Sequence, residues 1–270
     1  MAKTLAVITV HGMGETRRNY ADELQGKLKS ELGNEHSKVH FGAVYYQDVL
    51  QPNEEEYFAA AESKLDYKKY RRWVLYGFGD AGALEYSRFR DDGAYERAQR
   101  EIFREVERAL EHVDSPETPI VIVAQSLGCQ VVTNYIWDAH RTVKPNYGLW
   151  RHDYSQYPDA DLEYLKLGTA RFLATTGCNI PIFIAGLPKD QRMPIDKPNA
   201  LFEWHNYFDE DDLLGWPLSE LNTDYAALVD DIPVNAGNIF RAWNPFSHTD
   251  YWGDPDVYKP IADKIRLAIG

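Results

Sequence analysis

A serine lies where a buried strand is expected to turn directly into a helix. Residues 119–124 read PIVIVA, an apolar run typical of a strand buried on both faces of a parallel sheet, and helical spacing of apolar residues begins just after Ser126. Such a turn strains the backbone at its tip and requires small residues two positions before and after it, here Ala124 and Gly128. It exposes the hydroxyl above the sheet, with the positive end of the helix directed at it. The pattern predicts a nucleophilic serine; the alternative is a buried serine that only caps the helix.

This motif resembles the nucleophile elbow of the α/β-hydrolase superfamily, whose usual sequence is Gly-x-Ser-x-Gly. Residues 124–128 read AQSLG, so alanine replaces the first glycine and keeps that position small. A second motif, HGMG at residues 11–14, follows the first expected strand, where this superfamily carries its His-Gly oxyanion loop. The resemblance implies an oxyanion hole formed by the backbone N–H groups of Met13 and Leu127. The alternative is a glycine-rich turn that merely ends a strand, and His11 is expected to be structural.

The general base is expected after a late strand, within hydrogen-bond reach of the serine. His248 follows a strand expected at residues 238–243 and lies in a loop marked by Pro245. Its context, SHTDY at residues 247–251, resembles the catalytic histidine loop of several lipase-like members of the superfamily. We therefore predict that His248 is the base. Solvated or core positions are expected for the histidines at 36, 40, 112, 140, 152 and 205.

Four consecutive acidic residues, 209–212, follow a strand expected at residues 201–207. The resemblance implies that the triad acid lies here, where it would accept the ring N–H of His248 and stabilise the imidazolium. Superfamily members with a similar loop have an Asp followed by an apolar pair and a Gly or Pro turn, which favours Asp212; Asp209 is the alternative. The remaining acids are expected to form a solvated turn. We predict no metal site, because the run lacks the spacing and glycine of an EF-hand.

The remaining segments position these motifs. Strands are also expected at residues 5–10, 39–46 and 180–185, and helices at about 20–32, 94–113 and 260–269. Strands separated by helices imply right-handed crossovers and a mostly parallel sheet covered on both faces. We therefore predict an α/β fold with about six strands, formed by residues 1–270 as a single domain.

Two segments are expected to be helical or aromatic insertions that could form a lid or cap, at about residues 53–93 and 141–166. The second insertion is rich in aromatic residues: Tyr147, Trp150, Tyr154 and Tyr157. Together with Trp216 these side chains could line an acyl pocket, or they could form a packed surface insertion. Cys129 is expected to pack in the core.

Composition narrows the class of protein. The chain has 270 residues, 44% of them hydrophobic and 26% charged, as in an ordinary globular protein. Its 42 acidic and 29 basic residues give a formal net charge of −13, which disfavours nucleic acid and anionic lipid surfaces as partners. No apolar run is long enough to span a membrane or to form a signal peptide. With only two cysteines, a cytoplasmic location is predicted.

Together the motifs and the resemblance imply a serine hydrolase that cleaves a small-molecule carboxylic ester through an acyl-enzyme on Ser126, without a cofactor. The preference for an ester rests on analogy with the superfamily. The alternatives are a peptidase, amidase or thioesterase with the same triad, and a non-catalytic pseudo-hydrolase that binds a ligand or protein.

Overall fold

Six parallel strands form one sheet in the computed structural model, which describes residues 2–142, 145–236 and 247–270. The strand order is β2-β1-β3-β4-β5-β6, and all neighbouring pairs are parallel. The strands are β1 (Leu5–Val10), β2 (Val39–Val44), β3 (Ile120–Gln125), β4 (Ala170–Thr176), β5 (Glu203–Asp209) and β6 (Val229–Val234). The α/β class and the expected strand number are confirmed.

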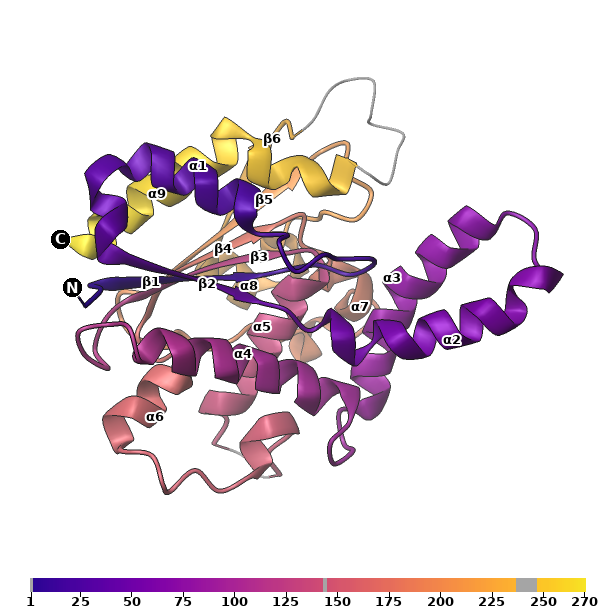
Figure 1. The fold of residues 1–270 in the computed structure, drawn as a ribbon, viewed down its shortest axis with the longest axis horizontal. Helices are drawn as coiled ribbons and strands as arrows, with labels where there is room; N and C mark the ends of the chain where they lie inside the picture. Colours follow the sequence, from indigo (N-terminus) through magenta and orange to yellow (C-terminus); the bar gives the residue numbers. More distant parts are fainter. Residues whose placement is uncertain (1, 143–144, 237–246) are drawn as a thin grey trace.

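Helices cover both faces of this sheet (Figure 1). On one face, α1 (Asp22–Leu32) packs against α9 (Pro255–Ile269). On the other, α4 (Ala94–Leu110) packs against α5 (Leu127–His140). The other helices are α2 (Gln51–Ala61), α3 (Lys68–Ser87), α6 (Asp159–Leu165), α7 (Ile180–Ile184) and α8 (Thr223–Leu228). Short 3-10 helices are η1 (Gly33–Lys38), η2 (Gln47–Val49), η3 (Glu62–Lys64), η4 (Gly148–Arg151), η5 (Lys189–Gln191), η6 (Ser219–Leu221) and η7 (Ser247–Gly253).

The two helical layers explain why the central strands are apolar along their whole length. Alternate residues of β1 point to opposite faces, so that Ile8 and Val10 belong to the core beneath α4 and α5. Leu5 and Val7 belong to the second core, beneath α1 and α9. Because both faces are buried, no position in β1 favours a polar side chain except Thr9, whose hydroxyl donates to the carbonyl of Gly42 at 3.0 Å.

The strand expected at residues 180–185 is wrong, because this segment forms the short helix α7. Pro181 occupies the first turn of α7, where its missing N–H leaves no hydrogen bond unmade. The strand at this place in the sheet is β4, which lies immediately before α7 in the sequence and is almost completely buried.

The sixth strand that the structure describes was not among the expected strands. Residues 238–243 lie outside the described part of the structure. The sixth strand is β6, which pairs with β5 through register partners such as Phe208 and Pro233. Proline and acidic residues are tolerated in β6 because it borders the described sheet, where one side of the backbone has no strand partner.

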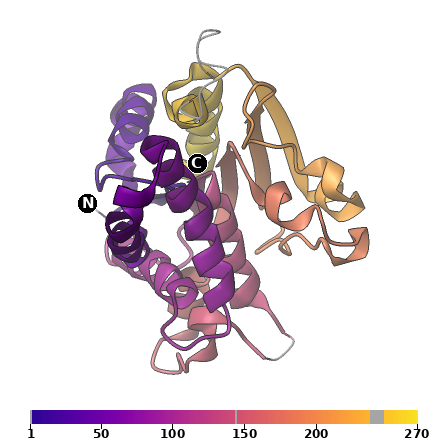
Figure 2. The same cartoon turned by 90° about the vertical axis from the view of Figure 1, so that its right-hand side faces the viewer.

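The two expected insertions occupy different places. Residues 53–93 include most of α2 and all of α3, which project beyond the carboxyl edge of the sheet (Figures 1 and 2). In the second insertion, the rings of Trp150 and Tyr154 lie 6.0 and 5.3 Å from that of Phe103 on α4. The rings of Trp150 and Tyr154 therefore pack against α4, whereas the ring of Tyr147 lies 5.1 Å from that of Phe89, between α3 and α4.

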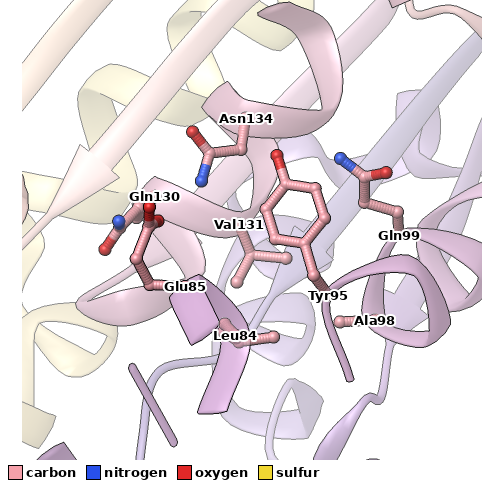
Figure 3. A pocket seen from close by; sticks show the side chains of 8 residues that line it. All are labelled: Leu84, Glu85, Tyr95, Ala98, Gln99, Gln130, Val131 and Asn134. Atoms are coloured by element: carbon pink, nitrogen blue, oxygen red, sulfur yellow. The ribbon is translucent and has the colours of Figure 1, made fainter. Parts of the chain in front are cut away.

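A buried polar cluster joins α3, α4 and α5. Tyr95 and Gln99 of α4 donate hydrogen bonds to Asp138 of α5 at 2.5 and 2.9 Å, and Arg88, at the end of α3, lies 3.8 Å from the same carboxylate. Burial raises the pKa of Asp138, although these three partners oppose the shift. Beside the cluster is a cavity of about 10 Å³, room for roughly one water molecule (Figure 3). Its lining includes Leu84 and Glu85 of α3 and Gln130 and Asn134 of α5.

No helix in the described part of the chain is both long enough and apolar enough to cross a membrane.

Candidate active site

Ser126 occupies the sharp turn between β3 and α5. Its backbone has φ 51° and ψ −124°, a conformation that residues other than glycine rarely adopt. The Ser126 N–H donates to the carbonyl of Thr176 at the end of β4, at 3.0 Å. The side chain is almost completely buried, and its Oγ makes no hydrogen bond with any residue that the structure describes. Among the described residues, the position of the serine hydroxyl is therefore set by the backbone of the turn and not by a hydrogen bond.

Two glycines allow the loop after β1 to contact this turn. A Cβ atom added to Gly128 would lie only 2.3 Å from the carbonyl oxygen of His11, so a larger residue cannot be accommodated without movement of the backbone. A Cβ atom added to Gly12 would lie 2.8 Å from Cβ and 3.4 Å from Oγ of Ser126. The backbone at Gly12 therefore lies directly against the serine side chain.

His11 supports this loop and is unsuited to proton transfer at neutral pH. Its Nε2 accepts a hydrogen bond from the Tyr46 N–H at 3.1 Å, so the proton lies on Nδ1, which donates to the carbonyl of Gly12 at 2.7 Å. The imidazole ring of His11 and the phenol ring of Tyr46 stack with their centroids 4.1 Å apart. Burial lowers the pKa of His11 to about 4, against the opposing effect of the Gly12 hydrogen bond. A neutral imidazole with both ring nitrogens hydrogen-bonded therefore fixes the conformation of the loop after β1.

Met13 and Leu127, the expected oxyanion donors, are the sequence neighbours of Gly12 and Ser126, which contact each other. Met13 follows Gly12, and Leu127 is the first residue of α5, where backbone N–H groups have no acceptor within the helix. Cys129, also in the first turn of α5, is fully buried, and its Sγ lies 3.4 Å from the carbonyl of Ala124. Its expected core position is confirmed.

The acidic run after β5 contains two buried and two exposed members. Asp209 and Asp212 are each 9% exposed, whereas Glu210 and Asp211 face solvent. The carboxylate of Asp209 accepts a hydrogen bond from the N–H of Asp211 at 2.9 Å. That of Asp212 accepts from the N–H of Leu214 at 2.9 Å. Both buried carboxylates thus stabilise turns of the same loop, and burial alone does not distinguish them.

Tyr251 distinguishes the two acids, because it connects the acidic loop to η7. Its buried hydroxyl accepts from the N–H of Asp209 at 2.9 Å and donates to Oδ2 of Asp212 at 2.8 Å. A Cβ atom added to Gly215 would lie 2.6 Å from the same Oδ2, so this close approach also requires glycine. The side chain of Asp212 is therefore in direct contact with Tyr251 of η7, whereas Asp209 contacts the same hydroxyl through its backbone N–H.

The next residue ties η7 to the sheet. Trp252 donates from Nε1 to Oγ1 of Thr176 at 3.1 Å, and Thr176 is the residue whose carbonyl accepts from Ser126. His248 belongs to η7, three residues before Tyr251, and its side chain lies outside the described part of the structure. The ends of β3, β4 and β5 and the helix that carries His248 thus meet at one edge of the sheet.

Sequence reasoning did not identify Tyr251, Trp252 or Thr176 as site residues. Tyr251 was present in the SHTDY motif, but only as context for the histidine. Within the described residues, no group of three or more His, Cys, Asp and Glu side chains is arranged to hold a metal ion.

Comparison with models of known protein families and with curated proteins found no match to this chain. The all-parallel six-stranded sheet flanked by helices is compatible with the α/β-hydrolase fold.

We predict that Gly128→Ala lowers the free energy of unfolding by about 1–3 kcal/mol, because the new methyl group must displace the His11 carbonyl. The matched control is Gly26→Ala in α1, where nothing lies within 4 Å of an added Cβ. Since alanine favours a helix interior, this control should gain about 0.5–1 kcal/mol. Urea denaturation of both variants measures the difference, and equal stability of Gly128→Ala and the parent protein would contradict the tight contact.

Proposed function

We propose that this protein is a serine hydrolase that cleaves a carboxylic ester through an acyl-enzyme on Ser126. The observation that carries the proposal is the backbone of Ser126, with φ 51° in a non-glycine residue at a strand-to-helix turn. Such a conformation costs about 1–3 kcal/mol and persists only where the surrounding structure enforces it, which is typical of functional sites. Direct contact of Gly12 with the serine side chain supports the same conclusion.

In the proposed mechanism, Oγ of Ser126 attacks the ester carbonyl while His248 accepts its proton. The negative charge that develops on the carbonyl oxygen is stabilised by the N–H groups of Leu127 and Met13, each worth about 3–4 kcal/mol in comparable sites. His248 then donates the proton to the leaving alcohol. A water molecule, deprotonated by His248, hydrolyses the acyl-enzyme and regenerates the serine.

Asp212 is the proposed acid of this triad. The hydrogen bond from Tyr251 supports this choice, because it brings the Asp212 carboxylate against the helix that carries His248. An ionised carboxylate there would hold the imidazole in the required tautomer and stabilise the imidazolium formed during attack. Asp209, whose carboxylate accepts the Asp211 N–H within its own turn, is the less favoured alternative.

We expect a fluorophosphonate probe to label the protein once, on Ser126, because the reagent requires an activated serine nucleophile. Ser126→Ala should abolish labelling, whereas the matched control Ser30→Ala, at an exposed position of α1, should label like the parent protein. Intact mass spectrometry and peptide mapping locate the adduct. A parent protein that does not react, or a Ser126→Ala variant that still does, would favour a non-catalytic pseudo-hydrolase.

Asp212→Asn should slow both labelling and ester turnover by up to about 10⁴-fold, since an amide cannot stabilise the imidazolium. The paired variant Asp209→Asn tests the other buried acid of the same loop, and it should retain most activity. Turnover of a p-nitrophenyl ester measures both effects. The opposite ranking of the two variants would assign the role of triad acid to Asp209.

To test the substrate class, the same series of acyl groups is compared in three kinds of substrate: p-nitrophenyl esters, anilides and thioesters. We expect p-nitrophenyl esters of graded chain length to be turned over faster than the corresponding anilides and thioesters, measured as kcat/KM. Faster cleavage of an anilide would indicate an amidase or peptidase, and faster cleavage of a thioester would indicate a thioesterase.

A further inference from the structure

One face of α3 holds the loop that follows β1. Oδ2 of Asp80 accepts a hydrogen bond from the N–H of Gly14 at 3.0 Å. One turn earlier in α3, a Cβ atom added to Gly77 would lie 3.4 Å from Sδ of Met13. Residues three apart in a helix lie on the same face. Met13 and Gly14 therefore both rest on α3, and the position of the Met13 N–H depends on this helix.

The carboxylate that holds Gly14 is buried beside a second acidic side chain. Asp80 is fully buried, and the carboxyl group of Glu54, on α2, lies near enough for the charge of Asp80 to act on it. Oε1 of Glu54 also lies against the backbone of α3, 2.6 Å from a Cβ atom added to Gly79. Neither oxygen of Glu54 accepts a hydrogen bond from an N–H or hydroxyl group of the described residues, and neither does Oδ1 of Asp80. A hydrogen bond between two carboxyl groups requires a proton on one of them.

We propose that Glu54 and Asp80 share one proton and that this carboxyl pair positions the oxyanion loop. Glu54 in its protonated form donates to Asp80, and ionised Asp80 accepts the N–H of Gly14. Both are positioning residues, because they act on the reaction only through Gly14 and Met13. The inference rests on the proposed hydrolase function, and it adds to that function a dependence of the oxyanion hole on the protonation of Glu54.

The pKa of Glu54 is higher than that of Asp80, as the proposed sharing of one proton requires. Burial raises the pKa of Glu54 to about 8, and the neighbouring Asp80 adds to the shift. Burial raises the pKa of Asp80 to about 6, opposed by its hydrogen bonds with Gly14 and Gln47 and by its interaction with Glu54. At pH 7 the pair therefore carries one proton, held mainly by Glu54, and one negative charge, held mainly by Asp80. Above pH 8 both groups ionise and repel each other.

The surrounding groups do not offset a second negative charge. Arg72 of α3 lies 2.6 Å from Glu15 and 3.7 Å from Glu55, so its charge is already shared by two carboxylates. Burial raises the pKa values of the neighbouring phenols Tyr46 and Tyr76, which stay neutral in this range. On η2, Asp48 forms an exposed ion pair with Arg18. Ionisation of Glu54 is therefore expected to separate α2 from α3 and to loosen the hold on Gly14.

The test compares the parent protein with Glu54→Gln, in which an uncharged amide can donate to Asp80 at any pH. The matched control is Glu56→Gln, the same change at an exposed position of α2. Between pH 7 and 9.5 the fluorophosphonate labelling rate of the parent protein and of Glu56→Gln should fall about tenfold or more, since one lost oxyanion donor costs about 10²–10³-fold. The rate for Glu54→Gln should stay level over this range.

Stability provides a second readout that does not depend on catalysis. The pKa of Glu54 in the folded protein, about 8, exceeds its ordinary value of 4.5, so the folded state holds the proton more tightly than the unfolded chain. The resulting stabilisation is complete below pH 4.5 and is lost as the pH rises to about 8. Urea denaturation should therefore show the parent protein losing stability relative to Glu54→Gln between pH 5 and 8.

The outcomes separate the two proposals. If the parent protein does not react with the probe at any pH, the hydrolase function fails, and the denaturation curves alone decide whether the carboxyl groups share a proton. If labelling occurs with the same pH profile in the parent protein and in Glu54→Gln, the positioning role is overturned. A constant stability difference between these two proteins from pH 5 to 8 would overturn the shared proton itself.

Discussion

The turn between β3 and α5 lies directly against the end of β1. The arrangement of residues at the carboxyl edge of the sheet depends on this contact. Gly128 is pressed against the carbonyl of His11, and Gly12 against the side chain of Ser126, so the two segments cannot separate without loss of both contacts. The N–H of Ser126 is fixed in turn to the end of β4. These contacts supply the constraint that keeps a non-glycine residue at φ 51°.

Hydrogen bonds from η7 hold together the part of the carboxyl edge formed by the ends of β4 and β5. Tyr251 joins this helix to the acidic loop after β5, and Trp252 joins it to Thr176. Buried hydrogen bonds to a charged group contribute about 1.5–3 kcal/mol each, so the contact between Tyr251 and Asp212 is a substantial one. The segment that carries His248 is thus positioned by its large aromatic neighbours.

The sequence predicted the parts of this arrangement that depend on local patterns. The apolar runs of β1 and β3 and the small residues around Ser126 are local signals, and they led to the correct central strands. Local signals failed at residues 180–185, where a short apolar run is equally compatible with a helix, and at β6, where border strands tolerate polar residues and proline. Asp80 could not be predicted, since its bond to Gly14 joins residues that are distant in the sequence and close only in the fold.

The two proposed oxyanion donors are linked through α3. Met13 and Gly14 rest on Gly77 and Asp80, in the middle of this helix. The end of α3 is fixed to α5 through Arg88 and the buried carboxylate of Asp138, and α5 begins with Leu127, the second donor. Because α3 contacts both elements, any displacement of α3 from the carboxyl edge would shift Met13 relative to Leu127. The projecting pair α2–α3 therefore contributes directly to the geometry of the site, in addition to covering that edge of the sheet.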